Sequence, residues 1–513
     1  MTRCLWIGLT TLALWGADDT GWQTYGGNAA GWRYSELAQI NAANVAHLVP
    51  KWMFQTQVPG NMETTPLVKN GVMYFTAPSN NAFALDLRTG HAIWRYSKKP
   101  PKELDLCCGE VNRGFAMLGD RLFKVNIEDT LVALDVASGR KIWETTLADY
   151  RKGYSGTLAP LVVKDKILVG TAGAEFGTRG FVDAYSAVTG ERLWRFYTVP
   201  GAKEPGSDTW SGDSNMRGGG STWITGTYDP ELNLTYWGTG NPGPDMNGDV
   251  RKGDNLYTCS IVAIDPDTGK LKWHFQFTPH DTHDWDAVAD PVLTDLTVAG
   301  RKVKAVIQAN RNGYFYALDR TNGKFLLAKP YTTITWSTGI GADGRPQVVP
   351  GLEPSEAGTK ACPGLGGGHN WQATALNPQT GLYYFGSSDG CQTYYRNDYD
   401  FIEGEWYQLS GTKEVPGEPG KGSFIGLDPA TGDIRWRFDM VRAPSGALTT
   451  AGGLVFMGDS SGHLIALDAR TGKVLWHFQT GGGIGAPPVT YTFEGKQYVA
   501  VGAGTVMVVF GLP

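Results

Sequence analysis

The chain has 513 residues, of which 19% are charged, and it contains 69 glycines and 18 tryptophans. This composition is typical of a turn-rich globular protein and excludes a disordered chain. The formal net charge is −5 and no basic run is present that would neutralise phosphates, so nucleic acid is excluded as a partner.

The first residues are arranged like an export signal. An apolar run from Cys4 to Trp15 follows a basic residue, and small residues precede the first acidic one. We predict a signal peptide at residues 1–17 and a mature chain of residues 18–513 in the periplasm, where disulfides persist. A large side chain stands at the cleavage site where a small one is preferred, which leaves an uncleaved anchor as the alternative. No later apolar run is long enough to predict a membrane span in the mature chain.

A ten-residue pattern recurs along the chain, as in LDLRTGHAIW. A glycine stands four residues before the tryptophan in each copy, and the copies end at Trp94, Trp143, Trp194, Trp273, Trp436 and Trp476. A degenerate copy ends at Leu327 and a copy without the turn at Trp52, which makes eight. Each copy predicts a strand, a turn whose glycine adopts a positive φ, and a strand whose aromatic side chain packs on the next unit.

The spacing of these copies predicts propeller blades. Successive copies from Trp52 to Trp194 lie 42, 49 and 51 residues apart, and blades of four short strands have periods of about 40 to 50 residues. The longer gaps before Trp273 and Trp436 should carry inserted loops. We predict an all-β, eight-bladed propeller that forms a single domain in residues 18–513, closed where the N-terminal strand at Trp52 pairs with the C-terminal strands. An array of β-sandwiches is the less favoured alternative. No helical pattern of useful length occurs, so the chemistry should lie on loops around the central channel.

Two of the six cysteines, Cys107 and Cys108, are adjacent. The Cα atoms of neighbouring residues are about 3.8 Å apart, whereas disulfides usually join Cα atoms roughly 4.4–6.8 Å apart. A bond between these cysteines would therefore be strained and would need a structural reason. Two buried thiols, or separate bonds to other cysteines, are the alternatives.

Several loop segments are similar to those of the quinoprotein alcohol dehydrogenases: CCGEVNRG, TAGAEFG, GTGNPGP, TPHDTHDWDAV, NRNGYFYALD and GGGHNWQATALNP. The resemblance extends from about Trp22 to the C-terminus. Members of this family are eight-bladed propellers that hold pyrroloquinoline quinone (PQQ) beside a metal ion. The resemblance implies a PQQ-dependent enzyme that oxidises primary alcohols to aldehydes by metal-assisted hydride transfer to the quinone. No Cys-x-x-Cys-His motif of a haem domain is present, so a soluble cytochrome c or similar carrier is the expected electron acceptor.

The resemblance also assigns the residues that hold the cofactor. One face of the quinone is expected to lie on a Cys107–Cys108 disulfide and the other on Trp223. Further contacts are implied for Glu63, Val111, Arg113, Thr157, Gly173, Ala174, Arg311, Asn370 and Trp371. A second disulfide, Cys362–Cys391, is implied around the last two, and Cys259 is left as a buried thiol. Many relatives carry a tryptophan that contacts the cofactor where this chain has Pro444 and Ser445.

The same resemblance assigns a metal site and a catalytic base. The implied ligands are Glu175, Asn241, Asp284 and Asp286. Asp284 takes the place of the base that removes the alcohol proton, and Arg311 the place of an arginine that hydrogen-bonds the quinone oxygens. Asp286 is the second aspartate that lanthanide-type members carry, and an extra anion suits a trivalent ion better than Ca²⁺.

Other interpretations of this segment stay open. It can be a hydrated acidic loop, or Asp281 can take the role of Asp284. His280 and His283 would suggest zinc, but no third soft ligand or helical spacing supports it.

Two functional classes compete with an alcohol dehydrogenase. One is a non-catalytic propeller like the scaffold lipoproteins of outer-membrane assembly, and the other is a quinoprotein that acts on sugars or polyols. The repeats report packing alone and do not separate these classes. The site residues taken together favour an enzyme, and the adjacent cysteines favour an alcohol as substrate, because the glucose enzymes lack that pair.

Overall fold

The computed structural model describes residues 19–513, so the predicted signal peptide lies outside the described residues. Within residues 19–513, no helix is both long enough and apolar enough to cross a membrane. The fold of this part is all-β, and its helical segments are short 3₁₀ turns: η1 (Val45–His47), η2 (Tyr150–Lys152), η3 (Ala174–Phe176), η4 (Ser207–Thr209), η5 (Ser214–Arg217) and η6 (Gly248–Arg251).

Most described strands belong to eight sheets of four or five strands. The first four sheets are β3 (Leu67–Lys69), β4 (Val72–Ala77), β5 (Asn81–Asp86), β6 (Ala92–Ser97); β7 (Ala116–Leu118), β8 (Arg121–Asn126), β9 (Thr130–Asp135), β10 (Lys141–Thr146); β11 (Leu161–Val163), β12 (Lys166–Gly170), β13 (Phe181–Ser186), β14 (Arg192–Tyr197); and β15 (Thr227–Asp229), β16 (Leu234–Gly238), β17 (Ser260–Ile264), β18 (Leu271–Gln276). The other four are β19 (Val292–Val298), β20 (Arg301–Ala309), β21 (Tyr314–Asp319), β22 (Phe325–Pro330); β26 (Ala375–Asn377), β27 (Leu382–Asp389), β30 (Lys421–Asp428), β31 (Asp433–Met440); β1 (Tyr34–Ser35), β32 (Ala447–Thr450), β33 (Leu454–Gly458), β34 (His463–Asp468), β35 (Val474–Gln479); and β2 (Val49–Gln55), β38 (Val506–Gly511), β37 (Lys496–Ala503), β36 (Val489–Phe493).

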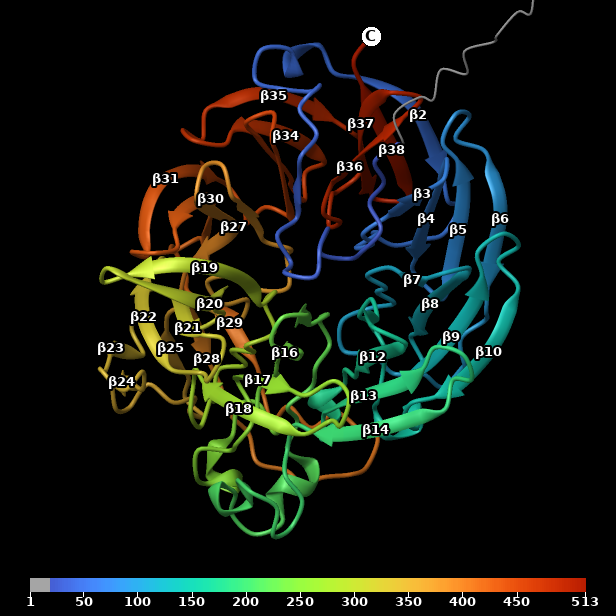
Figure 1. Cartoon of the computed structure of the whole chain (residues 1–513). Coiled ribbons are helices and arrows are strands. Elements are labelled where there is room, and N and C mark those ends of the chain that lie inside the picture. The colour runs from blue at the N-terminus through green and yellow to red at the C-terminus, as the bar shows by residue number, and fades with distance from the viewer. Residues whose placement is uncertain (1–18) are drawn as a thin grey trace, which may run out of the picture.

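The sheets are arranged around a common centre, as in a propeller (Figure 1). The beginning and the end of the described chain share one sheet, because β2 pairs antiparallel with β38 and places Trp52 opposite Val509. The short strand β1 also joins a C-terminal sheet, in parallel with β32. These pairings cover strand edges that would otherwise be exposed.

The repeat tryptophans connect each sheet to the next. The indole N–H of Trp52 donates to the carbonyl of Leu87 (3.0 Å), that of Trp94 to Val136 (2.9 Å) and that of Trp194 to Pro266 (3.0 Å). Each indole also lies against the glycine of the following repeat: a Cβ on Gly139, whose φ is +66°, would lie 2.6 Å from ring atoms of Trp94. The recurring Gly and Trp are therefore the two halves of one contact between units, as the repeat predicted.

The inserted segments form two additional small sheets among the described residues. One contains β23 (Ser337–Ile340) and β24 (Pro346–Val348), and the other β25 (Thr359–Ala361), β28 (Gln392–Tyr394) and β29 (Thr412–Glu414). The Cys362–Cys391 disulfide joins the end of β25 to the start of β28. This cross-link restrains the loop that carries Asn370 and Trp371.

Candidate active site

The two adjacent cysteines are bonded to each other in the loop between β6 and β7. Cys108 is exposed and Cys107 is half-buried. A carboxylate oxygen of Glu175 and both sulfur atoms lie within 4.8 Å of one another. Because a disulfide offers no thiolate, these three residues do not form a metal site by themselves. Their proximity instead places the disulfide beside a predicted metal ligand.

Arg113 lies at one end of the site and has unused donor capacity. It is 4% exposed, and its Nη2 lies 2.7 Å from Oε2 of Glu63. The guanidinium carbon lies 5.1 Å from the ring centroid of Trp223 and 5.2 Å from that of Trp371. Its Nε is buried without a hydrogen-bond partner. This group is suited to bind a carboxylate at the rim of a planar ligand.

Arg311 lies at the acidic end of the site, which Trp223 connects to Arg113. Its Nη2 donates to Oδ2 of Asp284 at 2.9 Å, and its Nη1 lies 3.2 Å from Oδ2 of Asp286. It also donates to the carbonyl of Leu365 at 2.7 Å. Asp284 has a φ of +59°, a backbone conformation that is rare outside glycine and often marks functional loops. The two aspartates are thus held by one guanidinium.

Asp286 connects the acidic end of the site to Trp223. Its Oδ2 accepts from Nε1 of Trp223 at 2.8 Å, and its Oδ1 accepts from the backbone N–H of Asn241. Asn241 is 1% exposed. Trp223, Asn241 and Asp286, which come from three separate loops, are therefore brought together as the resemblance implied.

Glu175 lies on η3, and a glycine gives the chain its path there. Gly173 has a φ of +105°, and a Cβ at this position would lie 2.0 Å from the carbonyl oxygen of Gly153. No other residue type fits that approach. Ala174 is buried directly before Glu175, and the Glu175 carbonyl accepts from the backbone N–H of Tyr407 at 2.6 Å.

Burial shifts the ionisation of the acidic residues. Burial raises the pKa of Glu175 to about 7, and the Asp286 carboxylate adds to the shift while Arg311 opposes it. Burial also raises the pKa of Asp284 well above its usual range, although Arg311 opposes the shift. Several carboxylates that share a buried space favour protonation unless a cation joins them.

The remaining predicted contact residues lie around these groups. Oγ1 of Thr157 donates to the carbonyl of Trp223 at 3.1 Å, and its own carbonyl accepts from the backbone N–H of Arg113 at 3.1 Å. Oδ1 of Asn370 is buried without a partner. Val111 is half-buried in the loop after the disulfide. The N–H of Ser445 donates to the carbonyl of Gly458, and its Oγ accepts from the N–H of Gly458.

The alternatives for the acidic segment have other partners. Oδ2 of Asp281 accepts from the backbone N–H of Trp285 at 3.0 Å. Nε2 of His283 bonds the carbonyl of Leu352 (3.0 Å), and Nδ1 of His280 bonds that of Gly253 (2.8 Å). Among the described residues, neither histidine belongs to a group of three potential metal ligands. The predicted thiol Cys259 is free and buried.

The sequence prediction missed Asp245. This residue follows Asn241 by four positions in the same loop and is 0% exposed. Burial, together with the Glu175 and Asp286 carboxylates, raises its pKa well above the usual range. It directly follows the GTGNPGP segment, but only the structure shows that it is buried.

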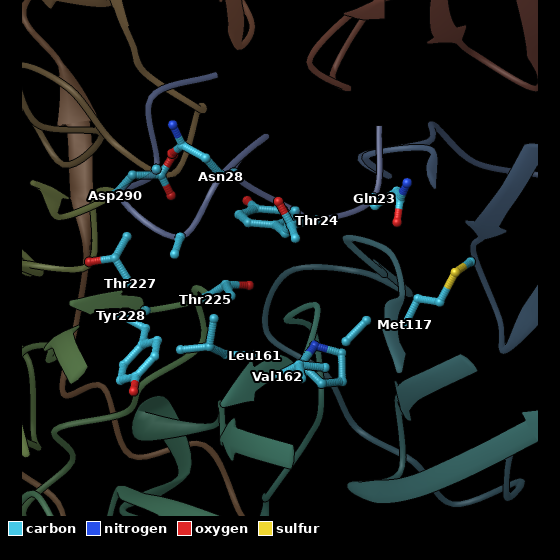
Figure 2. A pocket seen from close by; sticks show the side chains of 17 residues that line it. Gln23, Thr24, Asn28, Met117, Leu161, Val162, Thr225, Thr227, Tyr228 and Asp290 are labelled. Atoms are coloured by element: carbon cyan, nitrogen blue, oxygen red, sulfur yellow. The ribbon is translucent and has the colours of Figure 1, made fainter. Parts of the chain in front are cut away.

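A separate cavity of about 90 Å³ lies between β11, β15 and the N-terminal segment (Figure 2). Its lining includes Gln23, Thr24, Thr225, Thr227 and Asp290. None of the predicted cofactor or metal residues lines it, so it is distinct from the site described above.

The residues present fit both groups that the resemblance implied. The orphaned Nε–H of Arg113, with the exposed disulfide, suits a flat ligand that carries carboxylates, and Oδ1 of Asn370 is free to accept from a donor on such a ligand. The oxygen-rich set of Glu175, Asn241, Asp284 and Asp286 suits a hard cation rather than zinc. The site thus combines groups that could hold an anionic planar cofactor with groups that could hold a hard metal ion.

Comparison with known proteins agrees with these features. The family model described as "Glucose/ethanol/alcohol dehydrogenase, beta-propeller domain" matches residues 22–333, and the model of the outer membrane protein assembly factor BamB matches residues 410–511. The quinoprotein alcohol dehydrogenase PedH of Pseudomonas putida is 39% identical over 510 residues, which cover 94% of this chain and 85% of PedH.

Two further relatives are named for a lanthanide. A lanthanide-dependent methanol dehydrogenase of Methylacidiphilum fumariolicum is 38% identical over 94% of this chain and 84% of its own length. A solved europium-containing methanol dehydrogenase superposes with a TM-score of 0.90 at 35% identity, over 96% of this chain and 98% of the other. The chain belongs to the family of PQQ-dependent alcohol dehydrogenases.

Proposed function

We propose that this enzyme oxidises primary alcohols to aldehydes with Asp284 as the base. The observation that carries the proposal is the position of Arg311, which binds both Asp284 and Asp286 while Asp286 binds Trp223. This arrangement fixes Asp284 and Asp286 relative to Trp223, the residue on which the cofactor is expected to stack. The named relatives act on alcohols, which supports this substrate class over sugars and polyols.

PQQ would be held by the Cys107–Cys108 disulfide, Trp223 and Arg113, with Glu63, Val111, Thr157, Gly173, Ala174, Asn370 and Trp371 around it. When bound, the quinone supplies a two-electron acceptor and the metal ion a Lewis acid. The chain's own residues supply the proton acceptor: Asp284 would take the hydroxyl proton of the alcohol. Arg311 would keep its carboxylate oriented and would donate to charge that develops nearby.

The metal ion would be held by Glu175, Asn241, Asp284 and Asp286. The second aspartate supports a lanthanide(III) ion over Ca²⁺, because an added negative charge favours the trivalent ion more strongly. The lanthanide-dependent relative and the europium-containing structure support the same choice.

We further infer a closed ring of eight blades, one for each sheet of four or five strands, with the β2–β38 pairing as the closure. We also infer export to the periplasm by a signal peptide at residues 1–17, and electron transfer to a soluble cytochrome c or similar carrier. Mass spectrometry of the exported protein and assays with candidate cytochromes would test these inferences.

Reconstitution tests the main proposal. The purified apoprotein is incubated with PQQ and either La³⁺ or Ca²⁺, and alcohols are then assayed with an artificial electron acceptor. We expect activity on primary alcohols that is higher with La³⁺. If no alcohol is oxidised with either ion although PQQ is retained, the proposed activity is wrong.

A further inference from the structure

Asp245 differs from the other buried acidic residues among the described residues. Eight Asp and Glu side chains there are buried: Glu128, Asp129, Asp183, Asp229, Asp245, Asp281, Asp286 and Asp290. Seven of them have an ion pair or a hydrogen bond, for example Asp183 with Arg195 and Asp129 with Thr171. Both oxygens of Asp245 are buried without a hydrogen-bond partner. A carboxylate without compensation in such a place is costly.

The surroundings of Asp245 show what it faces. Glu175 and Asp286 are the carboxylates that act on its charge most strongly. The amides of Asn241 and Gln408 also lie near it, but neither forms a hydrogen bond of normal geometry with it. The segment at residues 407–408 links the two loops of the site. The backbone N–H of Met246 donates to the carbonyl of Gln408, and that of Tyr407 donates to the carbonyl of Glu175. Asp245 therefore lies near the predicted metal ligands, within range of the charges of Glu175 and Asp286.

The charges of this group do not balance within the protein. Four carboxylates, those of Glu175, Asp245, Asp284 and Asp286, give −4, and Arg311 contributes +1, so −3 remains. Arg251 lies near two of these groups: its Nη2 bonds the backbone carbonyls of Asp245 and Asp281, and burial lowers its pKa while the carboxylates of both residues oppose that shift. Counting Arg251 together with the Asp281 carboxylate adds +1 and −1 and leaves the sum at −3. A trivalent cation would neutralise the group, whereas a divalent one would leave a buried negative charge.

We propose that Asp245 is an additional carboxylate of the metal site and that it strengthens the preference for a trivalent ion. The inference rests on the proposed function, because it requires that the site binds a metal. Without Asp245 the residual charge would be −2, so the additional charge of Asp245 increases the preference for a trivalent ion that Asp286 already favours. With Asp245 as a ligand, its two oxygens, which no protein group hydrogen-bonds, gain a cation in direct contact.

A terbium titration tests this inference without relying on activity. Tb³⁺ is added to the apoprotein and to Asp245→Asn, and its emission is excited through nearby indoles such as Trp223. Ca²⁺ affinity follows from competition. We expect the Asn variant to bind Tb³⁺ about 10- to 100-fold more weakly. The loss for Ca²⁺ should be smaller, because the Coulomb energy scales with the charge of the ion.

Asp129→Asn is the matched control. Asp129 is also 0% exposed, and the charged groups that act on it are Asp183, Arg195 and Glu128, outside the metal site. This variant should bind Tb³⁺ like the wild type. Asp286→Asn serves as the positive comparison, with a loss of Tb³⁺ affinity similar to that of Asp245→Asn.

Thermal unfolding provides the second measurement. Because Asn removes an uncompensated buried charge at unchanged shape, the Asp245→Asn apoprotein should unfold at or above the wild-type temperature and gain less on adding Tb³⁺. A variant that fails to fold, or that binds Tb³⁺ within about twofold of the wild type, overturns the role of Asp245 alone. If the wild-type apoprotein binds neither Tb³⁺ nor Ca²⁺, the proposed metal-dependent function falls, and this inference with it.

Discussion

The two ends of the candidate site hold their arginines in opposite electrostatic settings. At one end, Arg113 pairs with a single carboxylate, that of Glu63, and keeps a buried Nε without a partner. At the other end, Arg311 binds Asp284 and Asp286 while Glu175 and Asp245 add further negative charge. The first end is short of an anion and the second is short of a cation. One site can therefore orient a ligand that carries carboxylates on one side and meets a metal ion on the other.

The largest expected effect is at the acidic end. Asp284→Asn keeps the shape of the side chain but removes a base, so turnover should fall by about 10²- to 10⁴-fold, while PQQ still binds. Single-turnover measurements with a primary alcohol, and the absorbance of the bound cofactor, check the two parts separately. Asp281→Asn is the control for the alternative base. If that variant loses turnover and Asp284→Asn does not, the assignment is reversed.

The next largest effect is expected at the opposite end. Arg113→Ala removes a buried cation that would bind a cofactor carboxylate, and such charge-assisted bonds contribute about 1.5–3 kcal/mol, so PQQ affinity should fall by about 10- to 100-fold. Fluorescence quenching by PQQ measures this affinity. The Tb³⁺ affinity should stay close to that of the wild type, because Arg113 lies away from the acidic group. A variant that loses Tb³⁺ affinity instead would contradict the division into two ends.

The pH should affect the two ends differently. The pKa of Glu175 is raised to about 7 by burial, so below pH 7 its proton competes with the metal. Metal affinity should therefore increase with pH, by up to about tenfold per unit for each proton displaced, and level off above the raised pKa values. Tb³⁺ titrations from pH 5 to 8 measure this slope. In Glu175→Gln the slope should be shallower, and an unchanged slope would exclude Glu175 as a ligand.

The sequence predicted the architecture well because its determinants are local. Trp94 and Gly139 belong to successive copies of one pattern, and the structure joins them directly. The predicted pairing of the strand at Trp52 with the C-terminal strands is present as well, since β2 pairs with β38. The disulfides Cys107–Cys108 and Cys362–Cys391 are both present, as the resemblance implied.

The role of Asp245 could not be predicted in the same way. An aspartate in a loop is most often solvated, and only the packed structure shows that both of its oxygens are buried without partners. The connection of Trp223 to Asp286 was also absent from the sequence prediction, because it depends on how loops 63 residues apart meet. Polar contacts between the loops of the site are set by tertiary packing, which no local pattern encodes.

The smallest expected effect separates the disulfide from both ends. The Cys107→Ser, Cys108→Ser double variant removes the sulfur surface under the cofactor but no charge from either end. Contacts between sulfur and a ring contribute about 0.3–1.5 kcal/mol, so PQQ affinity should fall by up to about tenfold, less than in Arg113→Ala. Tb³⁺ affinity should change little, although Glu175 lies beside both sulfurs. If the Tb³⁺ affinity of the double variant instead falls as strongly as that of Asp286→Asn, the disulfide positions Glu175. The disulfide would then contribute to the metal site as well as to binding of the cofactor.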